Sequence, residues 1–364
     1  SWGPVLDGSP FEAWNGETYA YSKYGNKLKD YFDTGFSQNH NVSISNGTET
    51  SHFRASFGAS DNKGVFPNEK LSRINIDLNA GTELNKWMSI DGKISLSRTK
   101  AEDRPEYGTY GAINQLMGIP HNVRLDDLKQ YSTEDAVHVN WYGPSAEIRN
   151  PYYVLHQRHN SDERWRAFGY YSTKISFTDW LHLSAKYAFD YYRTRVQNTN
   201  AGDAYNNETV PSAITDDKMD RGEENFFESN AEFILMGDRQ LTENFRLGFT
   251  LGSNFMYQKF ESLSAGVGNM LTKGEWMFNA ANLLRTAAET GKERAMNSVF
   301  GSVQMAWKEY LSLDLTARND WSSTLPKQNN SFFYPSANLS FVISDFMKSI
   351  YKSLPSWVTF AKLR

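Results

Sequence analysis

The chain has 364 residues, and its 38 Lys and Arg against 42 Asp and Glu leave a formal net charge of −4, without the basic excess that nucleic-acid binding needs. It contains no cysteine, which excludes disulfides, thiolate metal sites and cysteine nucleophiles. Aromatic residues reach 15%, yet the apolar runs are far shorter than the ~20 residues of a membrane-spanning helix.

Residues 1–33 precede the first predicted strand and are rich in aromatic side chains. The chain begins without an initiator methionine, a basic region or an apolar signal core, and it stops within a strand-like stretch. We therefore expect an internal piece of a longer protein, and every functional expectation below is subject to that limit.

Apolar and polar residues alternate with a period of two along most of the chain, which is the pattern of strands with one apolar and one polar face. Several of these runs exceed the about 5–6 residues of a typical strand and suit the about 9–11 residues of a bilayer crossing. We predict eleven strands, and the start of another near Val358, at residues 34–46, 50–61, 71–83, 87–99, 163–178, 181–198, 224–238, 245–263, 293–308, 311–321 and 331–344.

The connections between these strands alternate in length. Short turns at 46–49, 85–86, 179–180, 237–244 and 309–310 are separated by longer links at 62–70, 100–162, 199–223, 264–292 and 322–330. In an up-and-down sheet every second connection lies at the same end, so this pattern is typical of outer-membrane barrels with short periplasmic turns and long external loops.

The sequence therefore predicts an all-β fold, an antiparallel up-and-down transmembrane β-barrel of which this chain supplies about 11–12 strands. Residues 1–33 are expected to form an external loop, because the first connection is short and at least one strand should precede Ser1. Residues 100–162 are expected to form a long external loop with short helices, and residues 264–292 an external loop with a helix over 276–289.

A soluble antiparallel sandwich also alternates apolar and polar residues, but its strands are short and its loops do not sort by length. Tyr and Trp lie near several of the predicted strand ends, as in the aromatic girdles of membrane barrels. The two folds differ at Ile74, Ile76 and Leu78, which a sandwich would bury between sheets and a barrel would turn toward lipid.

Short motifs in the same order along the whole chain resemble the SusC/RagA family of TonB-dependent outer-membrane transporters. They lie at residues 1–8 (SWGPVLDG), 35–45 (GFSQNHNVSIS), 53–65, 150–153 (NPYY), 318–323 (RNDWSS), 333–341 (FYPSANLSF) and 360–364 (FAKLR).

This resemblance implies a bacterial outer-membrane barrel, closed by a plug, that imports an oligosaccharide or, less often, a peptide. It also implies a SusD-like lipoprotein over the external mouth and energy from the TonB complex. The TonB-contacting region, the plug and the C-terminal strands have no counterpart in this sequence.

The longest link carries the candidate substrate-binding residues. Aromatic side chains stack on sugar faces and bury peptide side chains, although they pack loops against a protein just as readily. The candidates are Tyr107, Tyr110, Trp141 and Tyr142. Charged residues on the polar strand face are expected to line the lumen, namely Arg54, Lys93, Arg166, Lys174, Lys186, Asp190, Asp314 and Arg318.

Metal and catalytic chemistry have weak support in the sequence. His156 and His159 have no evident third ligand, and the acidic residues at 126–127 and 216–220 lack the spacing of a calcium loop. Adjacent acids at 102–103 and 223–224 do not meet the separation of about 5–10 Å and the desolvation that glycoside hydrolysis needs. We expect no metal, cofactor or enzyme activity, and loop calcium stays possible.

The sequence thus predicts import of a large nutrient, an oligosaccharide before a peptide, at the outer membrane and in contact with its lipid. The alternative is a soluble or surface-exposed β-rich module that binds glycans or mediates adhesion. A surface hydrolase would require a carboxylate pair in a cleft, and none is apparent.

Overall fold

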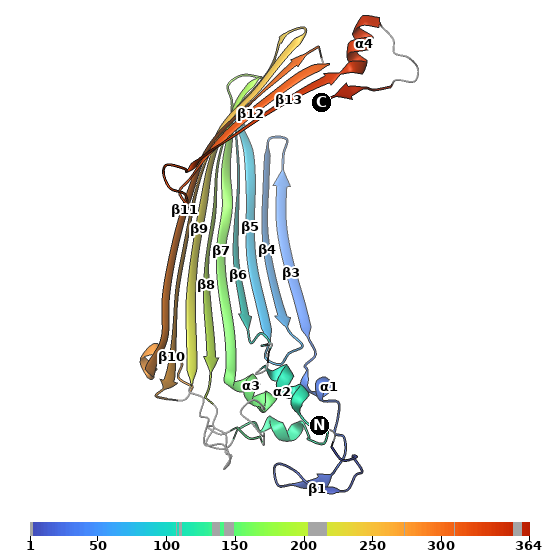
Figure 1. The fold of residues 1–364 in the computed structure, drawn as a ribbon, viewed down its shortest axis with the longest axis vertical. Helices are drawn as coiled ribbons and strands as arrows, with labels where there is room; N and C mark the ends of the chain where they lie inside the picture. Colours follow the sequence, from blue (N-terminus) through green and yellow to red (C-terminus); the bar gives the residue numbers. More distant parts are fainter. Residues whose placement is uncertain are drawn as a thin grey trace.

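The computed structural model describes residues 3–106, 108, 111–132, 139–141, 149–202, 217–272, 274–308, 310–351 and 359–364. Within these ranges, twelve strands form one antiparallel sheet in the order β14-β13-β12-β11-β10-β9-β8-β7-β6-β5-β4-β3 (Figure 1). The strands of this sheet are β3 (Phe36–Gly47), β4 (Ser51–Lys63), β5 (Lys70–Asn85), β6 (Met88–Glu102), β7 (Arg158–Ser176), β8 (Leu181–Asn200), β9 (Lys218–Thr242), β10 (Phe245–Met270), β11 (Ala281–Trp307), β12 (Leu311–Ser322), β13 (Ser331–Val342) and β14 (Lys362–Leu363).

The register gives this sheet two chemically different faces, because directly paired residues of neighbouring strands project to the same side. One row across β3 to β6 consists of Ile44, Ala55, Leu78 and Ile94. The adjacent row, on the other side, consists of Ser45, Arg54, Asn79 and Lys93. We call these sides the apolar face and the polar face.

The apolar face is exposed rather than packed against a second layer. Ile74 is 41% exposed, Ile76 39% and Leu78 41%. The other sheet in the described part of the chain has only two strands, β1 (Pro10–Glu12) and β2 (Thr18–Ala20), and does not cover this face. The sandwich alternative required burial of these three side chains between sheets, so the structure contradicts it.

The connections sort by length as predicted. The strand ends joined by the links 48–50, 86–87, 177–180, 243–244 and 308–310 lie at one end of the sheet, the turn end. The links 64–69, 103–157, 201–217, 271–280 and 323–330 join the opposite ends of the strands, which point toward the loop end; β12 and β13 stop well short of it, because Ser322 pairs with Met296. The turn end also carries α4 (Ile343–Tyr351), which follows β13 directly and which the sequence analysis did not predict.

The expected helix over 276–289 is wrong. The structure has a single 3-10 turn, η2 (Phe278–Ala280), and β11 begins at Ala281. Leu283 and Leu284 pair with Gly268 and Val267 of β10, so the hairpin extends well past the end of β12. Backbone pairing across the hairpin outweighs the local helix propensity of this segment.

The loop end carries a compact cap, which we define as residues 3–33, 111–132, 139–141 and 149–157 (Figure 1). Its helical elements are α1 (Lys27–Tyr31), α2 (Ala112–Gly118), η1 (Asp126–Lys129) and α3 (Pro151–Gln157). The described part of the chain has no helix long and apolar enough to cross a membrane.

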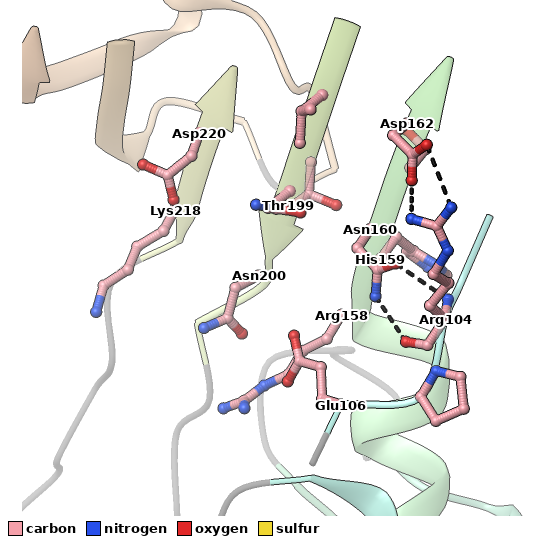
Figure 2. Close-up of a pocket in the computed structure, with 14 residues that line it drawn as sticks. Arg104, Glu106, Arg158, His159, Asn160, Asp162, Thr199, Asn200, Lys218 and Asp220 are labelled. Atoms are coloured by element: carbon pink, nitrogen blue, oxygen red, sulfur yellow. Dashed lines mark hydrogen bonds and ion pairs between the residues drawn. The ribbon is translucent and has the colours of Figure 1, made fainter. Parts of the chain in front are cut away.

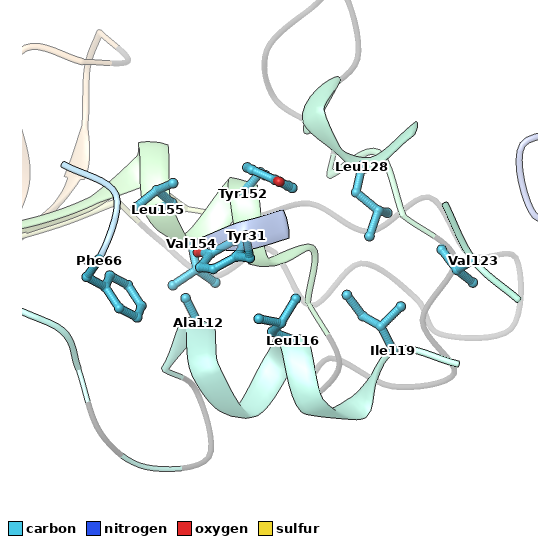
Figure 3. Packing of buried hydrophobic residues seen from close by; sticks show 10 residues of the cluster. All are labelled: Tyr31, Phe66, Ala112, Leu116, Ile119, Val123, Leu128, Tyr152, Val154 and Leu155. Atoms are coloured by element: carbon cyan, nitrogen blue, oxygen red, sulfur yellow. The ribbon is translucent and has the colours of Figure 1, made fainter. Parts of the chain in front are cut away.

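The main cluster of buried apolar side chains joins this cap to Phe66 of the link between β4 and β5, and it does not lie on the sheet (Figure 3). Its members are Tyr31, Phe66, Ala112, Leu116, Ile119, Val123, Leu128, Tyr152, Val154 and Leu155. The Lys27 ammonium group fixes the N-terminal segment to this core by donating a 2.9 Å hydrogen bond to the carbonyl oxygen of Ile119. Burial lowers the pKa of Lys27 to about 8.

Candidate functional site

A polar hollow of about 540 Å³ opens at the loop end, where β7, β8 and β9 meet the link that follows β6 (Figure 2). We call it the mouth hollow. It is lined by Arg104, Pro105, Glu106, Arg158, His159, Asn160, Ser161, Asp162, Val196, Asn198, Thr199, Asn200, Lys218 and Asp220.

The mouth hollow continues the polar face of the sheet. Asn160 pairs with Asn198, and Asn198 pairs with Asp220, so these three side chains form one row across β7, β8 and β9. The row is in phase with Arg166 and Asp190, which lie further toward the turn end. A solute in the hollow would therefore stand at the entrance to the polar side of the wall.

Arg104 organises one wall of the hollow although it lies just beyond the end of β6. Its guanidinium forms an ion pair with the Asp162 carboxylate, and its Nη2 lies 3.3 Å from Oδ2. Its backbone amide donates a 3.0 Å hydrogen bond to Asn160 Oδ1, and its carbonyl oxygen accepts one of 2.9 Å from Asn160 Nδ2. These hydrogen bonds hold the start of the link that follows β6 against β7, and the Asp162 carboxylate neutralises the charge of Arg104.

Other charged groups of the hollow remain available to a ligand. In the described part of the chain, Arg158 and Lys218 take part in no ion pair, and neither does Glu106 or Asp220. Together with the amides and hydroxyls of the lining, these groups offer donors and acceptors of both charges. This chemistry suits a polar solute and gives no preference to a highly charged one of a single sign.

His159 joins the hollow to the cap. Its Nδ1 lies 2.9 Å from Asp103 Oδ1 and its Nε2 lies 3.1 Å from the carbonyl oxygen of His156. Both partners are acceptors, so the imidazolium form can donate to both, and the hydrogen bond to Asp103 raises the pKa of His159. Burial lowers the pKa of His156, whose ring is stacked on Tyr131 at 4.8 Å.

The two histidines therefore have partners other than a metal. Among the residues that the structure describes, no three His, Asp or Glu side chains gather as a metal ion would require. Asp126 pairs with Lys129, and Asp217 accepts a hydrogen bond from the backbone of Gly202. Asp216 lies outside the described residues, so calcium at the second acidic segment stays untested.

Of the four predicted aromatic binding residues, the structure describes Trp141. Trp141 packs against the cap core, with its ring 5.4 Å from that of Trp14 in an edge-to-face contact. The sequence analysis allowed two roles for this residue, contact with the substrate or packing of the loop, and the structure shows packing. Tyr107, Tyr110 and Tyr142 lie outside the described residues.

The eight predicted lumen residues all project from the polar face, as the register across the sheet requires. Arg166 donates to both carboxylate oxygens of Asp190, at 2.8 and 2.6 Å. Arg318 is bound to Asp320 and Ser298 at 2.8 and 2.9 Å. The polar face thus carries charged side chains that pair with one another. Contact between these residues and a transported solute stays a prediction.

Sequence reasoning missed the lining of the mouth hollow. Arg104 and Asn160 are 56 residues apart, and no local pattern brings them together. One signal was present in the sequence, because Asn160 and Asn198 each occupy the polar phase of a strand that continues beyond its last apolar residue.

No family model and no curated protein matches the chain. Solved structures do resemble it. The RagAB peptide transporter superposes with a TM-score of 0.70 at 17% identity, over 94% of this chain and 38% of that one. The RagAB peptide importer in the closed-closed state gives 0.70 at 18% over 92% and 37%, and in the open-open state 0.67 at 19% over 93% and 36%.

The chain spans less than two-fifths of each of these structures. At such identity the likeness concerns the fold alone, and it confirms the expected antiparallel up-and-down sheet, which has the strand arrangement of the RagAB structures.

Proposed function

We propose that this chain forms part of the wall and external mouth of a TonB-dependent transporter that imports a large polar nutrient across the outer membrane. The observation that carries the proposal is the pairing of an exposed apolar face with a polar face in one continuous sheet. In a closed barrel the first meets lipid and the second surrounds a hydrated path.

The substrate we propose first is an oligosaccharide. The mouth hollow is lined by several amides and hydroxyls, which can hydrogen-bond a ligand rich in hydroxyl groups. Its charged groups include both signs, and Arg104 is already neutralised by Asp162. An uncharged, polyhydroxylated solute can hydrogen-bond to this lining without bringing a further charge into it.

A peptide is the second candidate. Arg158 and Lys218 could meet the carboxylates of a peptide, while Glu106 and Asp220 could meet its cations. The RagAB structures named above are of a peptide transporter, and they have this fold. The same resemblance supports a SusD-like lipoprotein seated over the cap as the partner at the mouth.

Deletion of the gene for the full-length protein tests import directly. Growth of the deletion strain on oligosaccharides and on oligopeptides as the only nutrient is compared with that of the complemented strain. Loss of growth on an oligosaccharide supports the first substrate, and loss on peptides supports the second. Unchanged growth and unchanged uptake on every nutrient would contradict the import function.

A further inference from the structure

We propose that a second hollow, on the apolar face near the turn end, binds the acyl chain of a phospholipid from the leaflet at that end of the barrel. This inference goes beyond the proposed function and needs only that the apolar face meets the membrane. The hollow measures about 710 Å³ and lies over β5 to β8, in the tract that contains Leu78, Ala80, Gly92, Tyr171, Tyr187 and Phe189.

Small residues make its floor and larger ones its walls. Ala80 pairs with Gly92, so two adjacent strands lack bulk at the same level. One row further from the turn, Gly169 stands between Ile94 and Phe189. The rings of Tyr171 and Tyr187, which are 51% and 47% exposed, stand beside this depression on β7 and β8.

Gly169, in the row next to Ala80 and Gly92, is required by the close approach of β6 to β7. A Cβ atom there would lie 2.1 Å from the carbonyl oxygen of Lys93 and 3.1 Å from the Cα of Ile94. No other residue fits that approach without moving β6, so β6 and β7 are held close together beside the hollow.

The opposite side of the same strands is closed by polar side chains. Over Gly81, His52 Nε2 lies 3.1 Å from Asp91 Oδ2, and the Tyr170 hydroxyl donates a 2.6 Å hydrogen bond to Asp91 Oδ1. The Lys186 ammonium stands over the Tyr170 ring at 4.8 Å. Most of the residues that line the hollow, such as Leu78, Tyr171 and Phe189, project from the apolar face, so we place the hollow on that face.

The rim of the hollow indicates the orientation of its occupant. At the turn end, the hydroxyls of Ser51 and Thr82 lie 2.7 Å apart, and both residues line the hollow. Trp87, 53% exposed, occupies the adjoining turn, where an aromatic girdle meets headgroups. A lipid can place its ester groups at this rim, where they contact the hydroxyls of Ser51 and Thr82. Its acyl chain then points toward the loop end and contacts the apolar lining of the hollow.

The physical reason for binding is packing and not the hydrophobic effect, because lipid tails are as apolar as the protein surface. If the hollow were empty, the carbon atoms that line it would lack contacts on one side, and no water is present at that depth in the bilayer to fill it. A flexible acyl chain can follow a depression bounded by aromatic rings, so we expect one chain to reside there longer than its neighbours in the bilayer.

The test uses the full-length protein in vesicles of phosphatidylethanolamine and phosphatidylglycerol that contain phosphatidylethanolamine with a diazirine midway along one chain. After irradiation, labelled peptides are mapped by mass spectrometry. We expect labels to concentrate on the peptides that contain Tyr171 and Tyr187. Ala80→Phe should reduce this labelling about fivefold, as the loss of about ten carbon–carbon contacts implies.

Ala317→Phe is the matched control, because Ala317 is also an exposed alanine of the apolar face but lies on β12, away from the hollow. Its labelling pattern should equal that of the parent protein. Labels spread evenly over the apolar face, or an unchanged pattern in Ala80→Phe, would overturn the proposal. A cross-link between two copies of the protein at these peptides, in place of a lipid label, would also overturn the proposal and would indicate a dimer contact. A transporter that imports normally and yet shows even labelling would refute the lipid site alone.

Discussion

At the scale of single residues, the functional end of the molecule depends on a few polar contacts between distant parts of the chain. The amides of Asp103 and Arg104 donate to the backbone and side-chain oxygens of Asn160, at 2.8 and 3.0 Å. His159 adds a charge-assisted contact to Asp103 at the same joint. Protonation of the His159 imidazole can therefore influence how firmly Asp103 and Arg104, beside the mouth hollow, are held against β7.

This contact predicts a pH dependence of defined sign. The pKa of His159 is raised in the folded protein, so its contact contributes fully below the unfolded value of about 6.5 and is lost as pH rises through the folded pKa. Partial exposure limits the contribution to about 1 kcal/mol. Amide exchange at Asp103 and Arg104, divided by the intrinsic rate, should be slowed about fivefold more at low pH than at high pH.

His159→Gln should abolish this difference, whereas His121→Gln, at an exposed histidine of the cap, should preserve it. Burial of neutral His156 acts in the opposite direction and only below about pH 6.5. Equal pH dependence in the parent and in His159→Gln would contradict the role given to this imidazole.

At the scale of elements, the cap and the sheet are stabilised by different means. The strands are held by backbone pairing over as many as 27 residues, in β11, with little buried apolar surface. The helices of the cap are at most seven residues long, too short to be stable in isolation. They depend on the apolar cluster that the N-terminal segment and the long link build together.

Leu116→Ala should therefore loosen the cap and leave the sheet intact. Leu116 is 2% exposed in the cap core, and removal of such a side chain costs about 3 kcal/mol. Met117, the next residue of α2, is 66% exposed, so Met117→Ala should have almost no effect. Protease cleavage within 111–157 measures the cap, and the heat-modifiable shift on a gel measures the barrel. Equal cleavage of the two variants would contradict the cluster's role.

At the scale of the whole molecule, the fold inverts the arrangement of a soluble protein. Large apolar side chains such as Leu251 and Phe255 are 54% and 46% exposed on the sheet, while paired charges occupy its other face. β3, exposed along its whole length, and β13 and β14 form the two edges of the described sheet. Unpaired backbone groups are not tolerated in hydrocarbon, so we expect these edges to be paired in the membrane.

Substitutions at two neighbouring residues of β10 test which face of the sheet contacts lipid. Leu251→Arg places a charge on the apolar face and should cost about 2–4 kcal/mol near the middle of the bilayer. Thr250→Arg places the same charge on the polar face and should be tolerated. The folded fraction of the full-length protein after insertion into vesicles measures both. A larger loss in Thr250→Arg would reverse our assignment of the faces.

The amino-acid pattern alone was enough to predict the two faces, the order of the strands and the end toward which the long links lie. These features follow from a period of two and from the spacing of turn signals, both of which are local properties of the chain. The packing of Trp141 in the cap, the strand at 281–289 and the lining of the two hollows could be seen only in the folded chain. The strand depends on pairing across a hairpin, and the cap and the hollows depend on contacts between residues far apart in sequence, such as Lys27 with Ile119, 92 positions away. No local pattern contains the energies of these contacts.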